Sequence, residues 1–428
     1  MVRGRISRLS VRDVRFPTSL GGHGSDAMGG AFPLQHTDPD YSAAYVVLET
    51  DAEDGLKGYG ITFTLGKGTE VVVCAVNALA PHLLNKDLGD IVGDFRGFYR
   101  QLTSDGQLRW DPRKLVSCLD FRYITDVLTE EEAYEILRKG QVGKKEREEQ
   151  MLAHGYPAYT TSCAWLGYSD ATLKQLCSKA LEDGWTRFKV KVGADLQDDI
   201  RRCRLIRNMI GPEKTLMMDA NQRWDVPEAV EWMAKLAEFK PLWIEEPTSP
   251  DDILGHATIS KALVPLGIGV ATGEQCHNRV IFKQLLQAKA LQFLQIDSCR
   301  LGSVNENLSV LLMAKKFDIP VCPHAGGVGL CELVQHLIIF DFISVSASLK
   351  DRIWLHLLVP SYISTCARMC EYVDHLHEHF KYPVIIKKAS YMPPKDAGYS
   401  TEMKEESVKK HQYPDGEVWE KLLAAQVN

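Results

Sequence analysis

The segments RFKVKV at residues 187–192, TLMMDAN at 215–221 and PLWIEEP at 241–247 decide the fold of this 428-residue chain. Each is a short apolar run that contains or ends in charged residues, and an amphipathic stretch separates it from the next run. Five further runs have the same character: LVSCLDF at 115–121, GIGVATGE at 267–274, FLQIDSC at 293–299, PVCPHAGG at 320–327 and CEYVDHL at 370–376. Strands that alternate with helices predict parallel βαβ units, and eight such strands close a (β/α) barrel.

The N-terminal part of the chain has a different pattern. Apolar residues alternate at 5–16, 43–49 and 58–64, which predicts three strands of a small antiparallel sheet, and helical periodicity follows at 71–84. A loop at 21–41, rich in Gly, His and Asp, is longer than usual connections, which is typical of a functional or a disordered loop.

The predicted α/β fold divides the chain into three parts. We expect an α+β capping domain at 1–110, the barrel at 111–386, and a C-terminal segment at 387–428 that packs back on the capping domain. A helix between 129 and 155 is additional to the barrel, and its charged KKEREEQ run predicts a solvated face.

Composition narrows the class of protein. Hydrophobic residues make up 45% of the chain and charged residues 25%, as in ordinary globular proteins. A net charge of −6 argues against binding of nucleic acid, and no apolar stretch reaches the ~20 residues of a membrane span. Eleven cysteines without C-x-x-C spacing indicate a reducing compartment rather than secretion. Five arginines in the first 16 residues favour an exposed strand face over a targeting segment.

Charged and polar side chains stand near the ends of the predicted strands. They are Lys189, Lys191, Asp219, Asn221, Glu245, Glu274, Asp297, His324 and Glu371. From Lys191 to His324, with Asn221 left out, successive members are 28, 26, 29, 23 and 27 residues apart, which is one βα unit each. A single acidic residue at a strand end is more often a helix cap, but this periodic series predicts an active site at the C-terminal end of a barrel.

Three of these carboxylates, those of Asp219, Glu245 and Glu274, lie on successive predicted strands. Hard oxygen ligands suit Mg²⁺, and a ligand set poor in histidine argues against zinc. The alternative for Glu245 and its neighbour Glu246 is a carboxylate pair neutralised by Lys and Arg.

The two lysines and the histidine are candidates for acid–base chemistry. Lys189 and Lys191 point to the same side of a strand, and mutual repulsion and burial in a metal-bearing cavity would lower their pKa values enough for one to act as a base. An edge strand with outward lysines would fit the pattern equally. Asp297 beside His324 would raise the pKa of the imidazole and make it a general acid. The glycines at 326, 327 and 329 would either bind a carboxylate or form a tight turn.

Seven segments resemble the enolase superfamily in its mandelate-racemase branch, and within it the L-fuconate dehydratases: KVKVG, MMDANQRWDV, WIEEPTSPDD, ATGEQ, QIDSCRLGSVNE, PHAGGVGLCELVQH and EYVDHLHEHF. The resemblance extends over almost the whole chain. It implies an enolase-type barrel and a Mg²⁺-dependent lyase that converts L-fuconate to 2-keto-3-deoxy-L-fuconate by removal of the C2 proton and loss of the 3-hydroxyl. A sugar acid is then the partner, a homo-oligomer stays open, and the location is mitochondrial or cytoplasmic.

The resemblance also implies a role for each matching residue. The Mg²⁺ ligands are Asp219, Glu245 and Glu274. The catalytic set is Lys191 as base, Lys189 beside it, and His324 with Asp297 as acid. The substrate contacts are Asn221, Glu371, Asp26, His36 and Arg122, and the loop at 21–41 would close over the sugar.

The sequence departs from the pattern of this family in three places. Only DPRK at 111–114 precedes the first predicted barrel strand, where family members have a long helical segment, so we expect a truncated capping domain. An apolar stretch at 351–369 lengthens the step from His324 to Glu371 to 47 residues and is expected to be an insertion. The segment GGAFPLQ at 29–35 lengthens the capping loop.

Two alternatives stay open. A racemase or epimerase of the same superfamily would use Lys191 and His324 on opposite faces of the substrate without expelling hydroxide. A chain whose capping domain does not close the site would be catalytically impaired and would act as a binding or regulatory protein. A 2-keto-3-deoxy product would identify the dehydratase.

Overall fold

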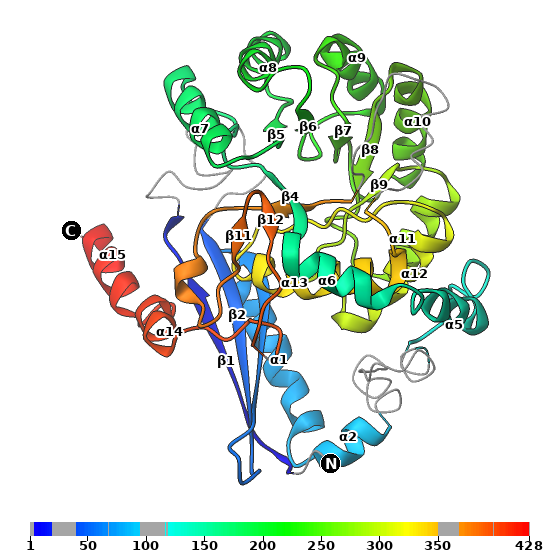
Figure 1. Cartoon of the computed structure of the whole chain (residues 1–428). Coiled ribbons are helices and arrows are strands. Elements are labelled where there is room, and N and C mark those ends of the chain that lie inside the picture. The colour runs from blue at the N-terminus through cyan, green and yellow to red at the C-terminus, as the bar shows by residue number, and fades with distance from the viewer. Residues whose placement is uncertain are drawn as a thin grey trace.

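The computed structural model describes residues 4–18, 40–66, 68–94, 116, 119–349, 368–396 and 398–427. An antiparallel sheet forms the N-terminal part, as predicted, from β1 (Ile6–Arg15), β2 (Tyr41–Thr50) and β3 (Lys57–Leu65) in the order β1-β2-β3. Helix α1 (Thr69–Leu83) packs beside this sheet and the short α2 (Leu88–Gly93) follows it (Figure 1). Most of the loop at 21–41, including the expected contacts Asp26 and His36, lies outside the described residues.

A closed parallel barrel follows, which confirms the predicted fold class. Its strands are β4 (Tyr156–Thr160), β5 (Arg187–Lys191), β6 (Thr215–Asp219), β7 (Trp243–Glu245), β8 (Gly269–Thr272), β9 (Phe293–Leu294) and β10 (Cys370–Tyr372). Between β9 and β10 the eighth position is held by an extended segment whose Val321 pairs in parallel with Leu294. The amide of Glu371 donates to the carbonyl of Pro323 at 3.2 Å, and β10 pairs with β4, so the barrel closes.

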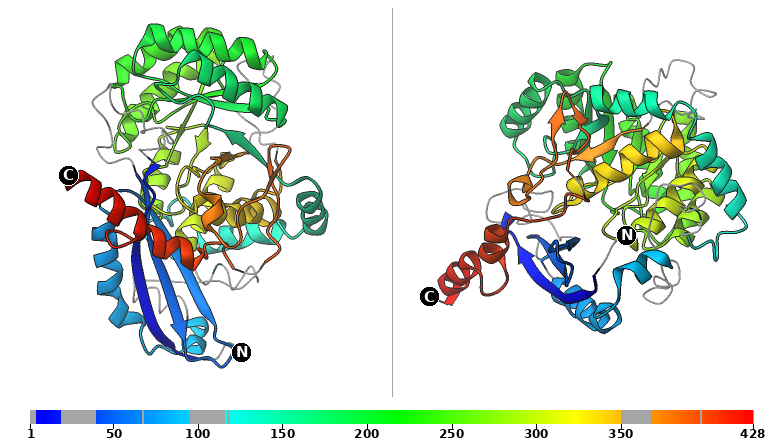
Figure 2. Two further views of the ribbon diagram at one scale, coloured as in Figure 1. Left: turned by 90° about the vertical axis from the view of Figure 1, so that its left-hand side faces the viewer. Right: turned by 60° about the horizontal axis from the view of Figure 1, so that its bottom comes forward.

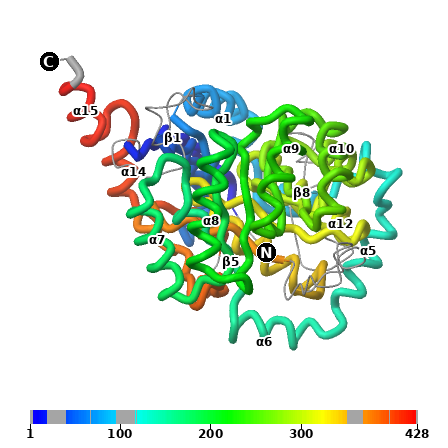
Figure 3. Tube along the Cα trace, turned by 90° about the horizontal axis from the view of Figure 1, so that it is seen from above, coloured from blue at the N-terminus to red at the C-terminus, as the bar shows by residue number. Residues whose placement is uncertain are grey.

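Helices cover the outside of the barrel (Figure 3). They are α7 (Asp170–Glu182), α8 (Leu196–Ile210), α9 (Val226–Leu236), α10 (Ile253–Leu263), α11 (Arg279–Gln287), α12 (Ser303–Lys316) and α13 (Leu330–Phe340). Within the described part of the chain, no helix is long and apolar enough to cross a membrane.

The side chains along β5 alternate between the outer and the inner face of the barrel wall, which explains the sequence pattern of the barrel strands. Phe188 and Val190 are fully buried in the cluster that joins strands to outer helices, where they contribute to the same core as Leu173 of α7 and Ile206 of α8. Side chains at the alternate positions therefore point into the barrel, and Lys189 is one of them. The sequence pattern thus places charge inside the barrel and apolar side chains between barrel and helices.

The strand predicted at 115–121 is wrong. Among its described residues Val116 is helical and the residues 119–121 lie outside any strand, with Leu119 and Phe121 buried against α5 (Glu130–Lys139), α11 and α12. Helices α5 and α6 (Lys144–His154) follow, so the first barrel strand is β4. A short buried apolar run does not show by its periodicity whether it forms a strand or a helix.

All three departures from the family pattern fall wholly or mainly on residues that the structure does not describe. The expected truncation at 111–114, the lengthened loop at 29–35 and all but the last two residues of the expected insertion at 351–369 lie outside the described residues, and the three stay predictions. Beside the second gap, Arg368 donates to the Asp341 carboxylate at 2.5 Å, and both residues are buried.

The C-terminal segment returns to the N-terminal sheet (Figure 2). After a hairpin of β11 (Ile386–Lys387) and β12 (Ser390–Tyr391), which pairs with β4, the helices α14 (Glu405–His411) and α15 (Glu417–Val427) lie beside β1. Arg12 of β1 forms an ion pair with Glu405 at 2.7 Å, and the indole of Trp419 donates to the carbonyl of Arg15. The division at 110 and 386 stays a prediction.

Candidate active site

The register of the parallel strands brings the predicted site residues together. Lys191 of β5 lies opposite Asp219 of β6, and Asp219 lies opposite Glu245 of β7, all at the C-terminal ends of their strands. Glu274 follows β8 by two residues and Asp297 follows β9 by three. His324 follows the extended segment beside β9, and Glu371 lies on β10. Parallel strands place their carboxyl ends at one edge of a barrel, so residues far apart in sequence converge there.

Lys189 sits at the centre of a buried cluster of charges. Its ammonium lies 2.6 Å from the Glu245 carboxylate, 2.7 Å from Glu371 and 3.3 Å from Asp219. Only 1% of the Lys189 side chain is exposed, so burial opposes its charge, but these carboxylates outweigh burial and raise its pKa well above the ordinary value. Lys189 is therefore a fixed positive charge.

Lys191 lies nearer the surface of the same cluster and 2.5 Å from the Asp219 carboxylate. We expected burial and repulsion by Lys189 to lower its pKa. Burial does oppose the charge of Lys191, but the carboxylates, Asp219 first and then Glu245 and Glu371, outweigh burial and the repulsion by Lys189, so the net shift of the Lys191 pKa is upward. The expected lowering of the pKa referred to a cavity that holds a metal ion, and without that ion the carboxylate that the register places beside the lysine decides the direction.

His324 and Asp297 form the pair that the sequence predicted. Nδ1 of His324 lies 3.0 Å from Oδ2 of Asp297, while Nε2 faces Glu371 at 3.6 Å and Glu274 at 3.7 Å. Burial would lower the pKa of His324, but Glu274 and Glu371 dominate and raise it to about 9. The raised pKa favours the protonated imidazole, and the contact with Asp297 orients the ring as a general acid requires.

These groups border a cavity of about 50 Å³ that also touches the N-terminal sheet. It is lined by Tyr41, Phe63, Leu65, Thr161, Trp165, Lys191, Asn221, Glu274, Arg300, His324, Gly326, Glu371 and Val373. The candidate base Lys191 and the candidate acid His324 therefore face one cavity. Asn221 also lines it, and its backbone amide donates to the Asp219 carboxylate at 2.9 Å.

Arg122 is not brought to this cavity. Its guanidinium pairs with the Asp120 carboxylate at 2.6 Å, and half of its side chain is exposed. Asp120 also pairs with Arg279, so Arg122 belongs to a charge network beside α11.

The carboxylates of the site suit a hard cation in kind. In the described residues, no three His, Cys, Asp or Glu side chains are already arranged to hold a metal ion. Each expected ligand instead pairs with a cation: Asp219 with Lys191, Glu245 with Lys189, and Glu274 with Arg300 at 3.2 Å. Glu246 indicates that negative charge is in excess at this site, because its buried Oε1 has no hydrogen-bond partner among the described residues. Burial, together with Glu274 and Asp219, raises the pKa of Glu246 well above its ordinary value. A divalent cation would relieve this repulsion.

Arg300 was missed by the sequence reasoning, which considered Glu246 only as a neutralised neighbour of Glu245. Arg300 follows Asp297 by three positions, donates to it at 2.6 Å and also pairs with Glu274, so it joins the histidine pair to the carboxylates. A basic residue three positions after a strand-end carboxylate was a signal that could have identified it.

Arg202 of α8 was also missed, since its charge lies in an otherwise ordinary amphipathic helix. Its guanidinium donates to the carbonyls of Lys191 at 2.8 Å, Ala164 at 3.0 Å and Trp165 at 3.1 Å, and it pairs with Asp199 at 3.3 Å. Only 1% of either side chain is exposed. Arg202 therefore fixes the end of β5 to the loop between β4 and α7.

The glycine cluster after His324 is explained by close approach of the N-terminal sheet. A Cβ at Gly327 would lie 2.7 Å from the Phe63 ring, and one at Gly326 would lie 2.8 Å from Nε2 of His324. Gly329 has a φ of 71° at the start of α13, a conformation that favours glycine. These observations favour a tight turn over the binding of a carboxylate.

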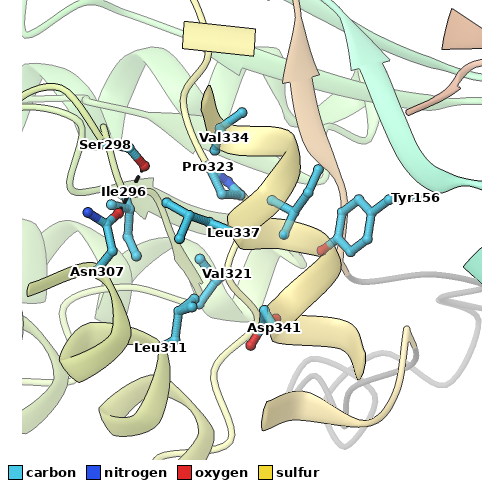
Figure 4. A pocket seen from close by; sticks show the side chains of 11 residues that line it. Tyr156, Ile296, Ser298, Asn307, Leu311, Val321, Pro323, Val334, Leu337 and Asp341 are labelled. Carbon is cyan, nitrogen blue, oxygen red and sulfur yellow. Dashed lines mark hydrogen bonds between the residues drawn. The ribbon is translucent and has the colours of Figure 1, made fainter. Parts of the chain in front are cut away.

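A second, much smaller cavity of about 10 Å³ lies between the barrel and helices α12 and α13 (Figure 4). Its lining is mostly apolar, with a hydrogen bond from Ser298 to Asn307 at one side and the hydroxyl of Tyr156 and the Asp341 carboxylate elsewhere. None of its lining residues belongs to the predicted site.

Comparison with known proteins gives a consistent result. Residues 172–407 match the family model described as enolase C-terminal domain-like. The chain is 80% identical over 466 aligned positions to mitochondrial enolase superfamily member 1 of Bos taurus, with 100% of both chains covered. It is 46% identical over 450 positions to L-galactonate dehydratase of Hypocrea jecorina, with 96% of this chain and 94% of the other covered. Because the bovine alignment is longer than the 428-residue chain, the bovine protein has residues where this chain has none.

Solved structures of other proteins share the fold of this chain. The crystal structure of human mitochondrial enolase superfamily member 1 matches with a TM-score of 0.90 and 79% identity, and 99% of each chain is covered. L-talarate dehydratase from a Polaromonas species, complexed with Mg and L-glucarate, matches with a TM-score of 0.65 and 20% identity over 96% of this chain and 98% of that one. The second likeness shows a shared fold.

Replacement of Arg202 by methionine tests the structural role of its buried contacts. The change leaves Asp199 as a buried charge without its cation and removes one donor from each of three carbonyls, so the free energy of unfolding should fall by about 3–5 kcal/mol. The adjacent Arg201 is the matched control, because its side chain is 49% exposed and its ion pairs lie at the surface; Arg201→Met should cost less than about 1 kcal/mol. Chemical denaturation of both variants measures the difference, and equal losses would contradict the buried role.

Proposed function

Because this chain belongs to the enolase superfamily, we propose that it is a Mg²⁺-dependent lyase that dehydrates an acid sugar, with L-fuconate as the substrate. The observation that carries the proposal is the placement of Lys191 and His324 in one cavity beside a cluster of buried carboxylates. A base and an acid on different strands can act on adjacent carbons of one small substrate. The relative named L-galactonate dehydratase makes L-galactonate the second candidate, and it differs from L-fuconate only by a hydroxyl at C6.

In this proposal Asp219, Glu245 and Glu274 would hold Mg²⁺. When bound, the ion supplies a fixed positive charge beside the substrate carboxylate, and its repulsion of the Lys191 ammonium favours the neutral amine that a base requires. Formation of the site then requires Asp219 to exchange its present partner Lys191 for the ion.

The chain's own residues would carry out the proton transfers. Lys191 removes the proton from C2, and Lys189, held as an ammonium by three carboxylates, offsets the negative charge that develops on the substrate carboxylate. Protonated His324 then gives its Nε2 proton to the departing hydroxyl at C3, which leaves as water, while Asp297 stabilises the imidazole. The resulting enol becomes the 2-keto-3-deoxy acid, so the overall change is the loss of one water.

We also propose a mitochondrial location, which the bovine and human relatives carry in their names. The arginine-rich start of the chain is compatible with it, although residues 6–15 form β1. Association between copies of the chain stays a prediction.

A panel of acid sugars, assayed with Mg²⁺ and again with a chelator, tests the proposed reaction. We expect a 2-keto-3-deoxy product from L-fuconate or L-galactonate, and its loss in the chelator because the carboxylates then lack their ion. Epimerised acid without keto product would favour a racemase. Absence of both would favour the impaired variant with a binding role.

Replacement of Lys191 by alanine should lower turnover by ~10²–10⁴-fold or more, because it removes the base. Binding of Mg²⁺ should stay largely intact, since the three carboxylates remain. Exchange of the C2 hydrogen with deuterium in D₂O, followed by NMR, measures the step directly. Exchange at the wild-type rate would rule out Lys191 as the base.

His324→Asn should separate the two halves of the reaction. Without the acid, hydroxide cannot leave from C3, so keto product should disappear while exchange at C2 continues through Lys191. Parallel measurement of exchange and product in this variant distinguishes the steps. Loss of exchange together with product would assign His324 a different role.

A further inference from the structure

The loop between β4 and α7 places two unusual polar groups in the wall of the active-site cavity. Thr161 and Trp165 both line this cavity, and they are only 3% and 4% exposed. Within the described part of the chain, neither the hydroxyl of Thr161 nor the indole N–H of Trp165 has a hydrogen-bond partner. Buried polar groups are nearly always paired, so two unpaired groups beside one cavity indicate a missing partner.

The chemistry of the two groups limits what that partner can be. The indole N–H only donates a hydrogen bond, whereas a threonine hydroxyl both donates and accepts. Both groups are neutral, so they offer no charge to a carboxylate or a phosphate, for which the cavity has Arg300. A hydroxyl group, which donates and accepts, matches the pair.

The position of these groups is fixed relative to the candidate base. The carbonyl of Ala164, between them in sequence, accepts from the amide of Lys191 at 3.1 Å and from Arg202. Arg202 also holds the carbonyl of Trp165, and the Trp165 ring packs against Tyr168 and His375. A pair of hydrogen-bonding groups held this firmly can discriminate between ligands, because little ordering is needed on binding.

Other polar residues of the cavity wall already have a role, since Asn221 is an expected substrate contact and Arg300 pairs with Glu274. Lys191, His324 and Glu371 face the reacting atoms in the proposed function, and the carboxylate cluster serves the first carbons of the acid. Tyr41, Phe63 and Leu65 come from the N-terminal sheet and are mainly apolar. Thr161 and Trp165 remain for the hydroxyls further along the sugar chain.

We infer that Thr161 and Trp165 form the subsite that binds the hydroxyl groups of the acid sugar beyond C3, and that they thereby select the substrate. The inference rests on the proposed function and adds to it the residues that recognise the sugar. A site built to pair with a hydroxyl rejects an analogue that lacks it, because its own polar groups then stay unpaired.

Three isosteric changes test the subsite. Thr161→Val removes the hydroxyl, Trp165→Phe removes the indole N–H, and Ser162→Ala is the matched control. Ser162 lies on the same loop and also has a buried hydroxyl without a partner in the described residues, but it does not line the cavity. Thr161→Ser, which keeps the hydroxyl, shows whether function is rescued.

The substrates are L-galactonate, L-fuconate and their analogues that lack the hydroxyl at C4 or at C5. For the full sugar acids, Thr161→Val and Trp165→Phe should each lower kcat/KM by about 3- to 10-fold, the effect of one neutral hydrogen bond. For the analogue that lacks the recognised hydroxyl the same variant should change kcat/KM by less than about twofold. Ser162→Ala and Thr161→Ser should stay within about twofold of the wild type throughout.

Binding measured by calorimetry in the Lys191→Ala background, with Mg²⁺ present, separates this inference from the proposed function. If the wild type makes no keto product, the proposed function fails. The subsite is then still supported if Thr161→Val weakens the binding of L-galactonate and Ser162→Ala does not. Equal affinities in all variants, no binding at all, or losses of the same size for the full acids and the deoxy analogues would overturn the subsite.

Discussion

Charge compensation inside the barrel is the constraint on which the rest of the site depends. Two lysines on one strand can be buried only if carboxylates reach them, and Asp219, Glu245 and Glu371 do so from three other strands. The parallel register supplies this arrangement, because it sets Lys191, Asp219 and Glu245 at one level. A slip of one residue would turn every one of these side chains away from the barrel interior.

Charge compensation at this site is incomplete, which suits the binding of a metal ion. Glu245, whose pKa is raised to about 8 by burial, and Glu246, with an unpaired oxygen, show that the carboxylates exceed the cations that now face them. Lys191 and Arg300 occupy the oxygens that an ion would need. In the proposed enzyme, an ion held by Asp219 would therefore also release Lys191 from its present ion pair, as a base requires.

The N-terminal sheet and the loop after β4 complete the cavity from two directions. The sheet reaches the turn after His324 closely enough that Gly327 has room for no side chain against Phe63. On the other side, Arg202 ties the loop that carries Thr161 and Trp165 to the end of the strand that carries Lys191. Reacting groups and the proposed recognition groups are thus held by a shared set of buried contacts, which suits a site that must align a flexible polyol.

The sequence by itself determined the periodic features of this protein. Alternating apolar residues predicted the N-terminal sheet and seven barrel segments, and the regular spacing from Lys191 to His324 predicted that their side chains converge. It did not reveal β4, which contains Pro157 and ends in threonines rather than charges, and it assigned a strand to the buried run at 115–121. Only the tertiary structure decided the sign of the Lys191 pKa shift, the separation of Arg122 from the cavity, and the contacts of Arg202. Those properties depend on which groups meet across strands and loops, and burial and pairing at such contacts are not encoded in the period of any single segment.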